Sequence, residues 1–160
     1  MLWPVVSALE RSVGAEDETT LSAKTCLAQV LHGLQQDSEA QPLIEEVLTV
    51  FFRSNLWSEV PIIEPLKLYA SIHFCNGQPE VGLQLMHEFL NTHKRMFGED
   101  HIATYEATYD LAEYCCKVGE YQEAGELFGR VTHAYAAFFG EEHAKTQDAR
   151  KRQSVFGSGE

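Results

Sequence analysis

The side chains of this sequence that could hold a metal ion are its seven histidines and four cysteines. Zinc sites usually present paired ligands at short, fixed spacing. His87 and His93 are six positions apart, so at about 100° per residue they lie on different faces of a helix. His73 and Cys75 are two positions apart and diverge for the same reason. The spacing therefore predicts no metal site and no cofactor.

Catalytic motifs would be the second source of chemistry. The sequence holds no G-x-x-x-x-G-K-[ST] phosphate loop, no G-x-G-x-x-G nucleotide motif and no H-E-x-x-H zinc helix. Its adjacent carboxylates, such as Glu45 with Glu46 or Glu141 with Glu142, are neighbours on the chain and rarely converge on one substrate atom. The sequence predicts a protein that is not an enzyme.

Charge and composition narrow the classes of partner. Lys and Arg total 12 and Asp and Glu total 24, which gives a net charge of −12 at pH 7. An acidic surface repels phosphate backbones, so we expect no nucleic acid. No apolar run approaches the ~20 residues of a membrane span, and the N-terminus lacks the basic region of a secretory signal. The cysteines lack C-x-x-C spacing, which indicates reduced, buried thiols in a cytoplasmic protein.

A repeat of 42 positions indicates the secondary-structure elements that must position these side chains. Residues 97–104 and 139–146 both carry phenylalanine, glycine, glutamate, histidine and threonine in the same register. Repeats of ~20–50 residues indicate supersecondary units that stack on their neighbours. Small residues recur in this register, where two helices must approach closely: Ala28, Ala70, Ala112, and Ala40, Gly82, Ala124.

Each repeat is expected to consist of a shorter helix A, a tight turn and a longer helix B, because its apolar residues recur at helical spacing. The A helices are predicted near 20–34, 62–76 and 104–118. The B helices are predicted near 38–54, 79–96 and 121–138. Residues 2–13 align with the end of a B helix, and 146–155 align with the start of a fourth A helix.

The residues that indicate helix ends are glycines and threonines. Gly77 and Gly119 fall in the turns, where glycine can adopt positive φ, whereas the first repeat has Gln35 and should have a less sharply specified turn. A second expectation concerns helix starts, where a hydroxyl can accept a bond from a free backbone N–H; these N-caps would be Thr20, Thr104 and Thr146. The loop at 55–62 should be irregular.

The sequence resembles the tetratricopeptide repeats, and within them the 42-residue repeats of kinesin light chains. Residues 111–130 follow the family pattern of leucine-alanine, a glycine turn, tyrosine, glutamate-alanine, an aromatic and a basic residue, and both loops resemble the leucine-glycine-x-x-histidine-proline-x-threonine signature. The resemblance implies an all-α, right-handed superhelical solenoid of antiparallel helix pairs, with three full repeats and a half repeat at each end. Residues 1–156 would form this domain, and 157–160 a disordered tail.

The resemblance also implies which residues meet a partner. In the family's superhelix the A helices line the concave face, where a protein or peptide binds. The positions that correspond here are Gln29, His32, Glu64, Lys67, Ser71, Phe74, Glu106, Tyr109, Glu113 and Lys117. Glutamates in this set could attract a basic peptide, and they could equally form a solvated helical face.

Two functions of different classes follow. The first is an adaptor that binds a peptide segment of a partner on the concave face. The alternative is a helical accessory domain of a larger enzyme or motor assembly, since the repeats also resemble the C-terminal helical region of SET-MYND methyltransferases, with catalysis outside this chain. The protein would be a monomer or a weak homodimer that associates through its end repeats.

Overall fold

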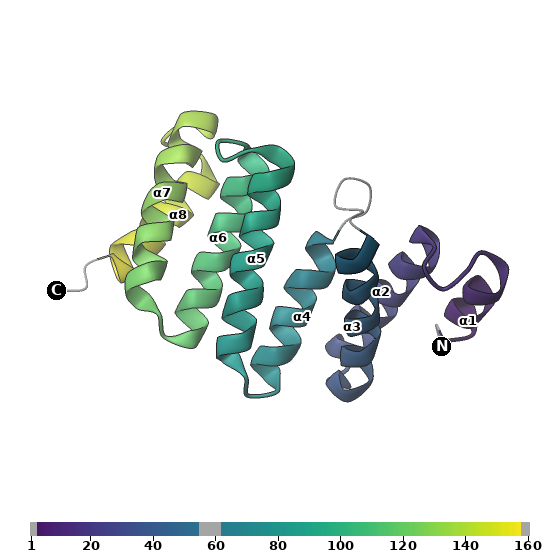
Figure 1. Cartoon of the computed structure of the whole chain (residues 1–160). Coiled ribbons are helices and arrows are strands. Elements are labelled where there is room, and N and C mark those ends of the chain that lie inside the picture. Colours follow the sequence, from purple (N-terminus) through teal and green to yellow (C-terminus); the bar gives the residue numbers. More distant parts are fainter. Residues whose placement is uncertain (1–2, 55–61, 158–160) are drawn as a thin grey trace. The chain divides into compact units, whose positions relative to one another are not determined.

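The computed structural model describes residues 3–54 and 62–157, and every regular element among them is an α-helix. The chain forms two compact units, residues 1–82 and 83–160. In chain order the helices are a single helix, three successions of a shorter and a longer helix, and a further single helix (Figure 1). This order confirms the predicted all-α repeat fold. No helix in the described part of the chain combines the length and apolar character that a membrane crossing requires.

The first unit contains α1 (Trp3–Ser12), α2 (Glu18–Gly33), α3 (Asp37–Ser54) and α4 (Ile63–Cys75), and α5 (Pro79–Phe97) begins at its end. Helix α2 packs on α1 and α3, and α3 packs on α4. Ala28, Ala40 and Ala70 have no exposed surface, as expected of small residues where helices approach closely. Ile44 and Val47 of α3 fill the core beside them.

The second unit contains the rest of α5 together with α6 (Ile102–Val118), α7 (Tyr121–Phe139) and α8 (Ala144–Phe156). Helix α7 packs on both α6 and α8. Ala112 of α6 and Ala124 of α7 are fully buried, which matches their assigned role in the repeat. Phe128 and Val131 complete the buried face of α7. The observed helix ends agree with the sequence prediction to within about two residues, the usual spread of boundary assignment.

The expectation that threonines cap the A helices is wrong. The N-caps are Asp17, His101 and His143, whose side chains accept a hydrogen bond from the backbone N–H two residues later. The helices α2, α6 and α8 are thus each capped three residues before their threonine. The histidines of the repeat loop therefore have a hydrogen-bonding role.

The three threonines instead close the loops from inside. They are buried, and each hydroxyl donates to the carbonyl oxygen of the glycine six residues earlier: Thr20 to Gly14 at 2.7 Å, Thr104 to Gly98 at 2.6 Å and Thr146 to Gly140 at 2.8 Å. The three glycines have positive φ. Residues 13–20 are therefore a third copy of the loop, with Asp17 in the place of the histidine.

The loop before α4 departs from this pattern. Ile62 precedes the helix in an αR conformation, and its side chain makes no capping bond. Pro65 lies in the first turn of α4, where proline is tolerated. The rest of the segment predicted to be irregular lies outside the described residues, as do 158–160 of the predicted tail.

The turn glycines behave as expected, and Gln35 copies them. Gly77 and Gly119 have φ of 73° and 90°, and Gln35 has φ of 61°. A side chain in this left-handed region costs ~1–2 kcal/mol, partly offset by glycine's greater chain entropy when unfolded. We expect Gln35→Gly to raise the free energy of unfolding by about 0.5–1 kcal/mol.

The matched control is Gly77→Ala, where a Cβ would meet no atom within 4 Å and only the backbone conformation is strained. It should destabilise the chain by about 1 kcal/mol. Urea unfolding of both variants measures whether each substitution raises or lowers the free energy of unfolding. A neutral Gln35→Gly together with a destabilising Gly77→Ala would mean that the first turn carries no strain.

Candidate functional site

The second unit has a hollow of about 570 Å³ between α6, α7 and α8. Tyr109 of α6 and Tyr135 of α7 provide two aromatic walls, whose ring centroids lie 6.5 Å apart in a stacked orientation. The lining also contains charged side chains from two helices: Glu106, Asp110, Lys145 and Asp148. The hollow therefore combines apolar surface with charge, as binding pockets of this size usually do.

Ion pairs join the two A-type helices beside the hollow. Lys145 Nζ of α8 lies 2.6 Å from Glu106 Oε1 of α6, and its ammonium is 5.5 Å from the ring centroid of Phe139. Two turns further along α8, Arg152 lies 2.9 Å from Glu113 Oε1. Two of the predicted partner-binding glutamates are thus already paired, which reduces the negative charge that they offer to a ligand.

The Tyr109 hydroxyl is a hydrogen-bond donor in this hollow. Its Oη donates to Asp148 Oδ2, and Arg152 Nε also donates to Asp148 Oδ2 at 3.3 Å. Burial, followed by the hydrogen bond to Asp148, raises the pKa of Tyr109. Burial likewise raises the pKa of Tyr135. Both phenols stay neutral at physiological pH, so neither supplies a phenolate nucleophile.

Of the predicted site residues in the second unit, Glu106 and Tyr109 line the hollow, and Glu113 adjoins it through Arg152. Lys117 is exposed at the end of α6 and is not among the lining residues. Four charged or aromatic residues of the lining were not among the predicted ones: Asp110, Tyr135, Lys145 and Asp148. Asp148 could have been found, because it follows Glu106 by one period of 42 positions. Tyr135 could not, because it lies on a B helix.

The predicted residues in the first unit are spread over three places. Gln29 and Glu64 line a smaller hollow of about 170 Å³ between α2 and α4. His32 is engaged elsewhere, since its Nδ1 lies 2.6 Å from Asp37 Oδ1. The other three lie along α4: Lys67 is half-buried, Ser71 donates to the Lys67 carbonyl at 3.2 Å, and Phe74 is 38% exposed.

The cysteines are less buried than expected. Cys115 is buried, and burial raises its pKa to about 12, so it behaves as an inert core residue. Cys116 is half-buried, whereas Cys26 and Cys75 are exposed. The expectation of four buried thiols is therefore wrong for the first unit.

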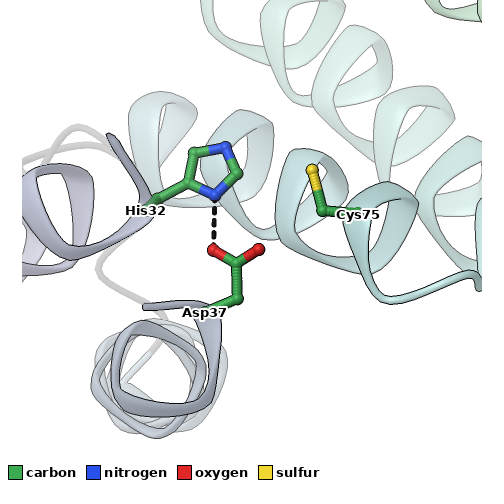
Figure 2. A group of neighbouring side chains, drawn as sticks. All are labelled: His32, Asp37 and Cys75. Atoms are coloured by element: carbon green, nitrogen blue, oxygen red, sulfur yellow. Dashed lines mark hydrogen bonds and ion pairs between the residues drawn. The ribbon is translucent and has the colours of Figure 1, made fainter. Parts of the chain in front are cut away.

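Three side chains that commonly bind metals come together in the first unit: His32, Asp37 and Cys75. Figure 2 shows them arriving from three different segments, with the imidazole and carboxylate facing each other and the thiol to one side. One ligand atom from each residue lies within 4.8 Å of the others. The expectation of no metal site considered spacing along single helices, whereas these three residues come from three different helices.

The comparisons with known proteins identify the fold. No protein-family model and no curated protein matches the chain. A crystal structure of a candidate kinesin light chain from Podosopora anserina, with nearly identical TPR-like repeats, is 20% identical with a TM-score of 0.83 and is matched over 96% of this chain and 73% of that chain. A single-substitution variant of that protein gives the same values.

A second similar structure is BtubC (BKLC) from P. vanneervenii, which is 15% identical with a TM-score of 0.67. The match covers 97% of this chain and 65% of that chain. The first of these proteins is described as having nearly identical TPR-like repeats, which agrees with the successive helix pairs of this chain. This chain has the fold of the tetratricopeptide-like repeats of kinesin light chain type.

Proposed function

We propose that this chain is a protein-interaction module that binds a peptide segment of a partner protein in the hollow between α6, α7 and α8. The repeat fold supports a binding role in general, because stacked helical repeats present extended, preformed surfaces. The observation that carries the proposal is the hollow itself, which is open to solvent and lined by two tyrosine rings and four charged side chains. A volume of about 570 Å³ lies within the ~300–1,000 Å³ range of ligand pockets.

The lining indicates the chemistry of the bound side chain. Three carboxylates line the hollow, those of Glu106, Asp110 and Asp148, against the ammonium of Lys145 in the lining and the guanidinium of Arg152, which binds Asp148 from beside it. An apolar group could stack on the tyrosine rings while a cationic or hydroxyl end meets the carboxylates. The net charge of −12 would speed the approach of a positively charged segment. A basic peptide with an aromatic or long aliphatic side chain is the ligand that we propose.

The test fills the hollow without changing its charges. Ala144 lines the hollow at the start of α8, so Ala144→Trp would place a large ring in the binding volume. Ala137 is an exposed residue of α7 that is absent from the lining, so Ala137→Trp is the matched control. Peptides selected from a displayed random library on the wild-type chain are titrated into each protein by calorimetry.

We expect Ala144→Trp to weaken the selected peptides by at least about tenfold, equivalent to ~1.4 kcal/mol. Ala137→Trp should bind like the wild type, and both variants should keep the helical circular dichroism of the wild type. Equal affinity for all three proteins would place peptide recognition on another surface. Selection of acidic peptides would contradict the proposed ligand chemistry while leaving the site intact.

The proposal also includes the expectations about location, catalysis and other partners that were drawn from the sequence. The chain would act by binding in the cytoplasm, with no chemistry of its own and no nucleic-acid or membrane partner. Self-association through the end repeats stays a prediction. For the alternative, a helical accessory domain of a larger assembly, the docking surface would include Trp3 and Val5 of α1, which are 44% and 49% exposed.

A further inference from the structure

The geometry of His32, Asp37 and Cys75 points to a second binding site, one for a divalent transition-metal ion of the Zn²⁺ class. We propose that these three side chains bind one such ion per chain. His32 lies in the last turn of α2, Asp37 is the first residue of α3 and Cys75 is the last residue of α4. The three helices belong to one compact unit, and the site uses none of the residues that line the hollow in the second unit.

The distances are close to those that a bound ion requires. Zinc binds nitrogen and oxygen ligands at about 2.0–2.2 Å and thiolate at about 2.3 Å, so tetrahedral donors lie roughly 3.3–3.6 Å apart. The His32 Nδ1 to Asp37 Oδ1 distance is 2.6 Å, and one ring nitrogen of His32, one carboxylate oxygen of Asp37 and the Cys75 sulfur lie within 4.8 Å of one another. Separating the hydrogen-bonded pair and drawing in the thiol needs movements of about 1 Å. Side-chain rotation supplies this, because Cys75 is exposed at the end of its helix.

The donor set indicates the class of ion. A thiolate and an imidazole favour zinc and its neighbours in the transition series over Ca²⁺ and Mg²⁺, which prefer oxygen ligands alone. Three protein ligands leave a fourth position of the tetrahedron for water. Because Cys75 is exposed while His32 and Asp37 are half-buried, an ion could enter from the side of the thiol.

Binding must release protons, which gives the site a chemical signature. Cys75 binds metal as a thiolate, so the proton on its sulfur passes to solvent. The proton shared between His32 Nδ1 and Asp37 Oδ1 leaves when the ion takes its place, unless it moves to the other ring nitrogen. A purely structural role, in which the His32–Asp37 hydrogen bond ties the end of α2 to the start of α3, does not involve Cys75. The thiol, as a third potential ligand beside this pair, is the observation that indicates a metal ion.

The test uses Co²⁺ as a spectroscopic probe on the full-length, reduced chain. A cobalt–thiolate bond gives a charge-transfer absorption that nitrogen and oxygen ligands do not give. We expect one Co²⁺ per chain with this absorption, its displacement by Zn²⁺, and release of at least one proton in weakly buffered solution. Zn²⁺ should also raise the melting temperature of the wild-type chain.

Variants locate the ion. Cys75→Ser should abolish the charge-transfer band and the stabilisation by Zn²⁺, and His32→Gln should weaken binding at least about tenfold, as loss of a metal ligand does. Asp37→Asn should weaken binding in the same direction. The controls are Cys26→Ser, which changes the other exposed thiol of this unit, and His87→Gln, which changes a histidine of the second unit.

Two results would overturn the proposal. Bound Co²⁺ without a charge-transfer band in the wild type would show that no thiolate binds the ion. A band that survives Cys75→Ser, or that disappears in Cys26→Ser, would place the ion at another cysteine. Because neither result depends on peptide binding, the metal site and the proposed peptide site are tested separately.

Discussion

Removing both carboxylates that surround Lys24, by Glu10→Ala with Glu46→Ala, is expected to lower the free energy of unfolding by about 2–3 kcal/mol. The Lys24 side chain is 1% exposed, and its Nζ lies 2.8 Å from Glu10 Oε1 and 2.6 Å from Glu46 Oε1. Breaking a buried pair typically costs ~3–5 kcal/mol, because it leaves a buried charge without compensation. The expected cost is smaller here because both glutamates are partly exposed and water can approach the ammonium.

The matched control removes the cation and keeps the carboxylates. The corresponding position of the next repeat is Leu66, which is fully buried. Lys24→Leu therefore gives the first repeat the residue that the second repeat has at this position. We expect it to be neutral or stabilising, since replacing a buried charge by an apolar residue often is. Urea unfolding at pH 7 compares the two proteins. If Lys24→Leu costs as much as the double variant, the three-residue bridge itself stabilises the unit.

The same cluster predicts a dependence on alkaline pH. Burial lowers the pKa of Lys24, but the hydrogen bonds and charges of Glu10 and Glu46 outweigh burial, so the pKa lies above 10.5. Because the folded pKa is raised, the stability that Lys24 contributes is fully present below pH 10.5 and is lost as the pH rises through the folded pKa. Lys24→Leu should lack this part of the alkaline loss of stability.

The second large effect is expected from adding one methyl group, by Gly125→Ala in α7. A Cβ at Gly125 would lie 2.7 Å from the Phe156 carbonyl oxygen and 2.8 Å from Gly157 Cα, both backbone atoms at the end of α8. Such contacts force the backbone to shift, so we expect a loss of about 1–3 kcal/mol. The stacking of Phe156 on Tyr121, at a centroid distance of 5.7 Å, should be lost with it.

At Gly129, one turn further along α7, an alanine is expected to have the opposite effect on stability. A Cβ there would meet the Gln153 side chain at 3.3 Å, which can rotate away. Gly129→Ala should therefore gain the helix propensity of alanine, about 0.5–1 kcal/mol. Thermal unfolding followed by circular dichroism measures both variants. Equal effects of the two substitutions would mean that α8 does not press on α7 at Gly125.

Periodicity explains why the helices could be predicted from the sequence. Burial of a helical face imposes a spacing on the apolar residues, and the small residues Ala28, Ala70 and Ala112 mark the same place in every repeat. The helix starts were harder, because threonine can either cap a helix or donate to a loop carbonyl. At Thr104 it donates to Gly98, and His101 supplies the cap.

The candidate sites were less predictable than the helices, because their residues come from different helices. Of the residues that line the hollow, Tyr109 was among the predicted positions and Asp148 follows from the 42-residue register, whereas Tyr135 lies on a B helix and follows from neither. His32 and Cys75 are 43 positions apart, so spacing along one helix cannot indicate a shared ion. Lys24 occupies a core position of the repeat, and only the structure shows the carboxylates that compensate its charge.

The loop at 97–104 makes the repeat portable. The carbonyl of Gly98 that Thr104 binds and the backbone N–H that His101 caps both lie within this short stretch of chain, so the bonds that shape the connection are largely local. One further bond, from the Thr104 hydroxyl to the His93 carbonyl oxygen at 3.4 Å, ties the loop to α5. The loop at 139–146 repeats the same joint. Residues 98–139 could therefore be removed or duplicated as a 42-residue unit, with the sequence Phe-Gly-Glu kept at each junction. Gly98 and Gly140 are therefore the positions at which repeats could be inserted to lengthen this protein.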